Sequence, residues 1–163
     1  IPILLRPVKI SDEDLLKDFF YSLSDKSLYT RFFTSMPYIS HRLLQEFVVV
    51  DYTKQMVILA ILEEDVLEKV VGIGQYRVVE DSLTADIAFA VRDEFQGNGI
   101  GTMLTKYIAS IAVKEGILGF TADVLAENKA MVHCIEHINS TVTKEFKDGC
   151  YEMKVDLGRG KRR

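Results

Sequence analysis

The stretch from Gln96 to Thr102, which reads QGNGIGT, has the residue types that a phosphate-binding loop needs. Three glycines alternate with other residues, so the backbone can turn sharply and present several N–H groups to one ligand. A helix is predicted directly after the loop, and its N-terminus adds a partial positive charge. We therefore expect a pyrophosphate site made of backbone amides; a glycine-rich turn without a ligand is the alternative.

Two common phosphate-binding motifs do not fit this loop. The P-loop requires Gly-Lys-Ser/Thr after a four-residue gap, and that combination is absent. The dinucleotide fingerprint G-x-G-x-x-G fails because Thr102 stands where its last glycine belongs. The spacing that fits is Q-x-x-G-x-G.

A second chemical pattern is H-x-x-E-H in residues 133–137, the signature of an inverted zinc peptidase. On a helix, the apolar stripe would consist of Met131, Cys134, Ile135 and Ile138, which leaves both histidines near the solvent face. Only a short strand pair follows to supply a third ligand. We interpret the histidines as surface residues and expect no metal cofactor, with adventitious metal binding as the alternative.

The elements that position the loop begin with a strand at 3–9 and three helices. Ser11 is expected to cap the first helix, with Asp14 at the capping-box position. The second helix follows Ser24 and the third opens at Ser40; both carry apolar residues at helical spacing.

Three segments rich in Val and Ile, at 55–62, 69–79 and 84–92, predict an antiparallel meander. Gly72 and Gly74 indicate a bulge or a close approach to the backbone. In the third strand, Asp86 alternates with apolar residues and so points away from the apolar face.

After the loop, the sequence predicts a helix that runs to about residue 115 and is ended by Gly116, then a strand at 119–125 and a second helix at 127–138. Two strands at 141–146 and 150–157 follow, and the Asp-Gly pair between them predicts a hairpin. The fold class is therefore α/β (α+β), one domain over 1–157, with 158–163 as a basic tail or linker remnant.

Composition excludes several classes of protein. The 163 residues are 48% hydrophobic and 27% charged, which excludes disorder, and the net charge of −4 argues against a nucleic-acid partner. Apolar runs are too short to span a membrane. Two cysteines without motif spacing predict reduced thiols and a cytoplasmic location. The chain starts at Ile1, so we expect a processed product or a domain cut from a longer protein.

The Q-x-x-G-x-G loop and the order of elements resemble the Gcn5-related N-acetyltransferase (GNAT) superfamily across the whole chain. Residues 5–33, 51–56, 85–101 and 126–131 resemble the acetyltransferase domain of Pat-type protein lysine acetyltransferases, which is commonly fused to regulatory domains. This resemblance implies a mixed, mostly antiparallel sheet flanked by helices, with splayed central strands. It also implies acetyl-CoA as cosubstrate.

The resemblance assigns three groups of acyl-CoA contacts. The pyrophosphate loop consists of Gln96, Gly97, Asn98, Gly99, Ile100, Gly101 and Thr102. The strand along the pantetheine arm contributes Phe89, Ala90 and Val91, and the next helix contributes Asn128, Ala130 and Met131. The catalytic glutamate of the family falls at Asp86, which is one methylene shorter and could act through a bridging water. The tyrosine that many relatives use as an acid falls at Ile135, so that acid is absent here.

A carboxylate at Asp86 would serve a reaction that begins with a protonated amine. Lysine, with a pKa of about 10.4, must lose a proton before it attacks a thioester. We expect Asp86 to be partly buried, since burial makes a carboxylate a better base; a solvated strand residue or salt-bridge partner is the alternative. The leading hypothesis is acetyl transfer to a protein lysine. The alternatives are acetylation of a small amine or polyamine, and a non-catalytic acyl-CoA sensor.

Overall fold

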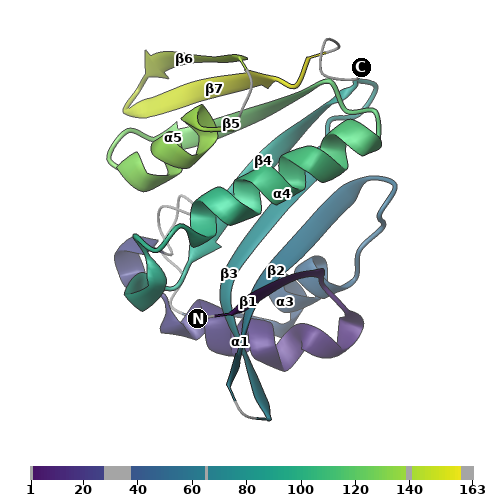
Figure 1. The fold of residues 1–163 in the computed structure, drawn as a ribbon, viewed down its shortest axis with the longest axis vertical. Helices are drawn as coiled ribbons and strands as arrows, with labels where there is room; N and C mark the ends of the chain where they lie inside the picture. Colours follow the sequence, from purple (N-terminus) through teal and green to yellow (C-terminus); the bar gives the residue numbers. More distant parts are fainter. Residues whose placement is uncertain (1, 28–37, 65, 139–140, 159–163) are drawn as a thin grey trace.

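The computed structural model describes residues 2–27, 38–64, 66–138 and 141–158 (Figure 1). It contains one sheet of strand order β1-β2-β3-β4-β5-β7-β6, made of β1 (Ile3–Pro7), β2 (Gln55–Glu64), β3 (Leu67–Val78), β4 (Thr84–Val91), β5 (Gly119–Leu125), β6 (Thr141–Lys147) and β7 (Cys150–Asp156). The helices are α1 (Glu13–Ser22), α3 (His41–Val48), α4 (Ile100–Lys114) and α5 (Lys129–Glu136), with short 3₁₀ turns η1 (Ile10–Asp12) and η2 (Asp93–Phe95).

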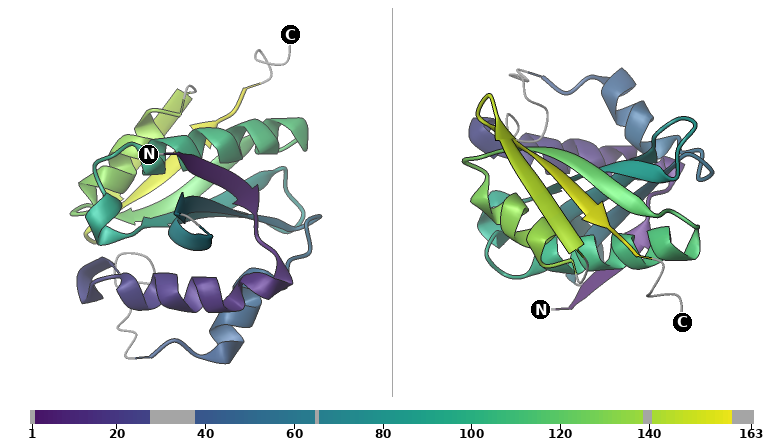
Figure 2. Two further views of the ribbon diagram at one scale, coloured as in Figure 1. Left: turned by 60° about the horizontal axis from the view of Figure 1, so that its bottom comes forward. Right: turned by 90° about the horizontal axis from the view of Figure 1, so that it is seen from above.

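The helices form a layer on each face of the sheet. Figure 2 shows α1 and α3 on one side and α4 and α5 on the other. Strand β2 supplies both cores, because Ile58 and Ala60 pack toward α4 while Val57 and Leu59 pack toward α1 and α3. On the α1 and α3 side, alternate residues of β5, β6 and β7 are solvent-exposed. The β5–β7 half of that face is therefore open.

The central strands β4 and β5 are parallel and separate after one short stretch of pairing. Their register runs from Thr84 opposite Gly119 to Asp86 opposite Thr121. Beyond this point β4 continues to pair with β3, and β5 continues to pair with β7. All other pairs in the sheet are antiparallel. The predicted mixed sheet with splayed central strands is confirmed.

The glycines of β3 allow α4 and β4 to approach closely. The β2–β3 register shifts between Ala60 and Ile61, which is the predicted bulge. A Cβ on Gly72 would lie 3.0 Å from Leu104 Cδ1, and a Cβ on Gly74 would lie 2.8 Å from the Phe89 ring. Both readings of these glycines, bulge and close approach, hold in the structure.

The predicted start of the first helix is wrong. The N-cap of α1 is Asp12, without a side-chain cap hydrogen bond, and Ser11 lies inside η1. The Asp12 carboxylate instead accepts two hydrogen bonds from the Arg6 guanidinium, at 2.7 and 2.9 Å, and one from Lys9 N–H at 2.7 Å. A contact between elements therefore overrides the local capping pattern.

The remaining helix predictions have mixed outcomes. Ser40 caps α3 as predicted, since its Oγ accepts a hydrogen bond from Leu43 N–H at 3.0 Å. Most of the predicted second helix falls on residues 28–37, and the end of the basic tail on 159–163; both lie outside the described residues. No helix in the described part of the chain is long and apolar enough to cross a membrane.

Candidate active site

The glycine loop joins η2 to the N-terminus of α4. Gly97 and Gly99 have φ angles of 83° and 84°, a region that favours glycine because it has no Cβ. Gly99 is the N-cap of α4, and the first helical bond runs from Met103 N–H to Gly99 O. The amides of Ile100 to Thr102 therefore have no acceptor within the helix. They are available to a ligand at the positive end of the helix dipole.

Side chains hold this loop against the end of β4. Gln96 Nε2 donates to Val91 O at 3.0 Å, and Asn98 Nδ2 donates to Phe95 O at 3.2 Å. Ser27 Oγ donates to Asp93 Oδ1 at 2.9 Å from the N-terminal part of the chain. The loop conformation is thus fixed by its own side chains as well as by its glycines.

Arg92 anchors the base of the loop, a role that the sequence alone did not indicate. It is 3% exposed, and its Nε donates to Val70 O at 2.7 Å. Its Nη2 donates to Asp18 Oδ2 of α1, also at 2.7 Å. The loop is therefore connected to both β3 and α1 through one buried guanidinium.

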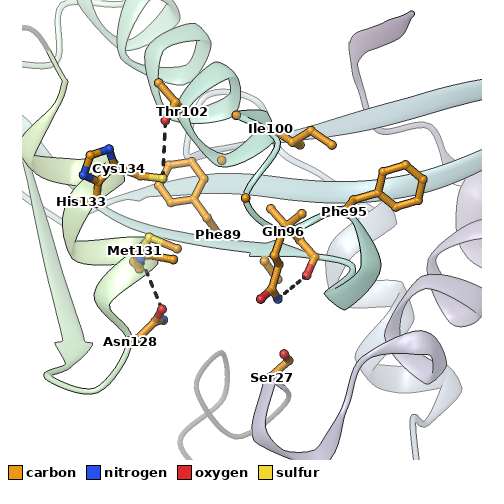
Figure 3. A pocket seen from close by; sticks show the side chains of 16 residues that line it. Ser27, Phe89, Phe95, Gln96, Ile100, Thr102, Asn128, Met131, His133 and Cys134 are labelled. Atoms are coloured by element: carbon orange, nitrogen blue, oxygen red, sulfur yellow. Dashed lines mark hydrogen bonds between the residues drawn. The ribbon is translucent and has the colours of Figure 1, made fainter. Parts of the chain in front are cut away.

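The loop borders a cavity of about 300 Å³ between β4, α4 and α5. Figure 3 shows Gln96 and Ile100 on one side and Asn128, Met131 and Cys134 on the other. Its lining contains every residue that the family resemblance assigned to acyl-CoA except Asn98. Four lining residues were not predicted: Ser27, Phe95, His133 and Cys134. The helical spacing of Cys134 from Ala130 and Met131 was the signal available for that residue.

A second cavity, of about 250 Å³, lies where β4 and β5 separate. It is lined by Asp86, Ile87, Ala88, Phe89, Thr121, Ala122, Asp123, Val124, Asn128, Met131 and Ile135. Phe89, Asn128 and Met131 line both cavities. The two cavities thus adjoin along β4, from the glycine loop to Asp86.

Asp86 lies at the far end of this path and points away from the apolar core, as predicted. It is exposed, so the expected partial burial is wrong; in the described part of the chain, α1 and α3 pack against β2 and β3 on this face and leave Asp86 uncovered. The Thr121 hydroxyl donates a hydrogen bond to Asp86 Oδ1 across the last paired position of β4 and β5. Arg77 is opposite Asp86 on β3 and donates to Gln55 at 3.4 Å.

Helix α5 forms the other wall of both cavities. Asn128 caps it, since its Oδ1 accepts from Met131 N–H at 3.3 Å. Cys134 is a free thiol whose Sγ lies 3.8 Å from Thr102 Oγ1. Burial raises the pKa of this thiol, and the hydrogen bond with Thr102 lowers it by a smaller amount. His133 and His137 are exposed and their rings stack at 4.0 Å. Among the described residues, no group of three or more His, Cys, Asp or Glu could hold a metal ion.

Comparison with known proteins gives the class and then the family. Residues 14–139 match the model of the Acetyltransferase (GNAT) family. The domain is therefore an acetyltransferase, with the sheet and splayed strands described above. More particularly, the chain belongs to the GNAT family.

Similar proteins include two acetyltransferases and one solved domain. Acetyltransferase PA5475 of Pseudomonas aeruginosa is 26% identical over 129 residues, 79% of this chain and 69% of that protein. Acetyltransferase Pat of Mycolicibacterium smegmatis is 30% identical over 142 residues, 86% of this chain. The crystal structure of the GNAT domain of S. lividans PAT superimposes with a TM-score of 0.82 at 27% identity, covering 93% of this chain and 89% of that one. This chain spans only 42% of the length of the M. smegmatis protein.

Proposed function

We propose that this domain transfers the acetyl group of acetyl-CoA to the side-chain amine of a protein lysine. The observation that carries the proposal is the continuous lining of the two cavities, which leads from the glycine loop along β4 to Asp86. A phosphate-binding end and a carboxylate end are thereby joined by a path along one strand. This is the arrangement that an extended acyl-CoA and an incoming amine require.

In this proposal, acetyl-CoA lies along β4 with its pyrophosphate on the loop. The amides of Ile100, Gly101 and Thr102 face the phosphates at the helix N-terminus. Among the described strands, none pairs with the β5 side of residues 87–91, so its backbone groups can pair with the pantetheine arm. Asn128, Ala130 and Met131 close the opposite wall.

The chemistry follows from the position of Asp86. The acceptor ammonium loses one proton to the Asp86 carboxylate, directly or through one water. The neutral nitrogen attacks the thioester carbonyl carbon, so that a C–N bond forms and the C–S bond breaks. The second proton on nitrogen passes to the departing CoA thiolate, and Asp86 releases its proton to solvent. A backbone N–H of β4 near Ala90 or Val91 would stabilise the oxyanion.

The open sheet face favours a protein acceptor over a small amine. Asp86 is exposed, and neighbouring strands on that face are also exposed, so a polypeptide segment can reach it. The similarity to Pat supports the same acceptor class. We further propose that the domain belongs to a longer protein with regulatory domains, since it spans less than half of that relative. We propose a cytoplasmic location because both cysteines are free thiols.

Acetyl-CoA binding is tested by thermal stability with matched glycine variants. Acetyl-CoA should raise the melting temperature of the wild type, and Gly99→Asp should abolish that rise by placing a carboxylate beside the phosphates. Gly116→Asp is the control, because Gly116 also has a φ of 83° and open space around it but lies at the other end of α4. Equal acetyl-CoA responses in the two variants would contradict the loop assignment.

The reaction is tested by mass spectrometry of a proteome lysate and a panel of small amines incubated with acetyl-CoA. Acetylated protein lysines support the proposal, acetylated small amines support the alternative acceptor, and neither product supports an acyl-CoA sensor. Asp86→Asn should reduce transfer by about 10²–10⁴-fold with unchanged acetyl-CoA affinity, because only proton transfer is lost. Unchanged transfer would remove Asp86 from the reaction.

A further inference from the structure

The cavity between β4 and β5 contains a second carboxylate, Asp123, that the proposed reaction does not use. Asp86 pairs with Thr121 in the parallel register, and side chains alternate along a strand. Asp123 therefore projects on the same side of the sheet as Thr121 and Asp86. It lies two residues farther along β5, where the two strands have already separated.

The two carboxylates have different surroundings. The Asp86 carboxylate accepts the hydrogen bond of Thr121, whereas the Asp123 side chain forms no hydrogen bond or ion pair with any residue in the described ranges. The cross-strand neighbour of Asp123 is Glu152 on β7, another acid. Two like charges directly opposite each other destabilise a sheet. Lys154 of β7, which is opposite Thr121, shares this face but forms no ion pair with Asp123 within the described part of the chain.

The two cavities correspond to the two ends of the proposed reaction, the acetyl-CoA end and the acceptor end. The first cavity holds the glycine loop and shares Phe89, Asn128 and Met131 with the second. The second cavity, with Asp86 and Asp123, lies at the end remote from the loop. A molecule that enters it from the open face meets Asp123 and Asp86 on its way to the acyl group.

We infer that Asp123 is an acceptor-binding residue that holds the ammonium group of the incoming amine beside Asp86. This inference rests on the proposed function and adds the requirement that the acceptor be cationic when it binds. A carboxylate stabilises the charged ammonium, so Asp123 promotes binding and does not assist proton removal. Its loss should raise KM for the amine and leave kcat unchanged.

The experiment measures peptide binding and turnover with one matched pair of variants. The probe is a blocked heptapeptide with one central lysine among glycine and serine, with spermidine as the small-amine arm. Asp123→Asn should weaken binding of the peptide to CoA-loaded protein, and raise its KM, by about three- to tenfold, the effect of one partly solvated charge pair. Glu152→Gln is the control: it removes the same charge on the same face but does not line the cavity.

Two further measurements separate the possible outcomes. The peptide carrying Nε-acetyllysine should bind wild type more weakly than the lysine peptide and should not distinguish wild type from Asp123→Asn. The acetyl-CoA thermal shift should be the same in both variants, which shows that folding and cofactor binding are intact. If Asp123→Asn weakens the binding of spermidine more than that of the peptide, the small amine is identified as the source of the ammonium group.

The inference is overturned if Asp123→Asn binds the lysine peptide as tightly as wild type, if Glu152→Gln has an equal effect, or if wild type binds neither amine. Failure of the proposed function is a separate result. If the peptide binds in an Asp123-dependent way but is not acetylated, the inference stands and the transfer reaction does not. If the Asp123→Asn variant acetylates the peptide with the wild-type KM, the transfer reaction stands and the inference about Asp123 does not.

Discussion

Gly74→Ala is expected to destabilise the domain, although alanine is normally preferred to glycine in a strand. The added Cβ would lie 2.8 Å from both Cδ1 and Cε1 of Phe89 and 3.0 Å from Ile108 Cδ1. Ordinary van der Waals contacts begin at 3.4 Å, so the Phe89 ring must retreat by more than half an ångström. Phe89 is 5% exposed and packed within the core, which resists this movement.

The magnitude follows from two opposing contributions. Overpacking of a well-packed core costs about 1–3 kcal/mol. Replacing a glycine by alanine in a strand contributes about 0.5–1 kcal/mol in the stabilising direction. The free energy of unfolding should therefore fall by about 0.5–2 kcal/mol. In a Phe89→Val background neither clashing ring atom is present and only the 3.0 Å contact with Ile108 Cδ1 remains, so Gly74→Ala should cost much less there.

Urea unfolding of wild type, both single variants and the double variant gives the coupling energy between the two positions. We expect a coupling of about 1–3 kcal/mol, because the two 2.8 Å contacts exist only when the added Cβ and the Phe89 ring are both present. Phe89 lines both cavities, so Gly74→Ala should also weaken acetyl-CoA binding. The reasoning is refuted if Gly74→Ala does not lower stability, or if its effect is the same with Phe and Val at position 89.

Two further predictions concern titratable groups. Burial opposes ionisation of Asp12, but the hydrogen bonds from Arg6 and Lys9 outweigh it and hold its pKa below the ordinary value. Its contribution to stability is therefore present above the unfolded pKa of about 3.9 and is lost as pH falls through the folded pKa. Asp12→Asn should cost about 1.5–3 kcal/mol at pH 7, as for hydrogen bonds to a charged group, and progressively less in acid, measured by urea unfolding. Burial raises the pKa of Cys134, so in a Cys150→Ala background alkylation by iodoacetamide should be slow at pH 7, accelerate at alkaline pH and be blocked by acetyl-CoA. Fast alkylation at pH 7, or a pH-independent effect of Asp12→Asn, would contradict these assignments.

Much of the fold was predictable because local patterns and tertiary contacts agree. The turn Asp148-Gly149 has φ angles of 52° and 81°, which suit an Asp-Gly hairpin, and the strands on both sides end within one residue of the predicted bounds. Gly116 ends α4 with a φ of 83°, as a C-terminal glycine does. These signals act within a few residues, so the sequence carries them directly.

The predictions that failed depend on contacts that a single-element pattern does not describe. The Ser11 cap failed because Arg6 of β1 and the Lys9 amide engage Asp12 and fix the start of α1. The expected burial of Asp86 failed because the helices that cover this sheet face lie over its other half. Capping patterns and strand alternation by themselves indicate neither arrangement.

The sequence by itself determined the glycine loop, its place between a strand and a helix, and the alternation that turns Asp86 away from the core. These properties depend on backbone freedom and on the two-residue period of a strand. The tertiary structure decided that Phe89, Asn128 and Met131 join two cavities, that Arg92 anchors the loop, and that Asp123 faces the same space as Asp86. The reason is that β4 and β5, remote in the chain, pair for only a short stretch and then separate, and only that register fixes which side chains share the gap.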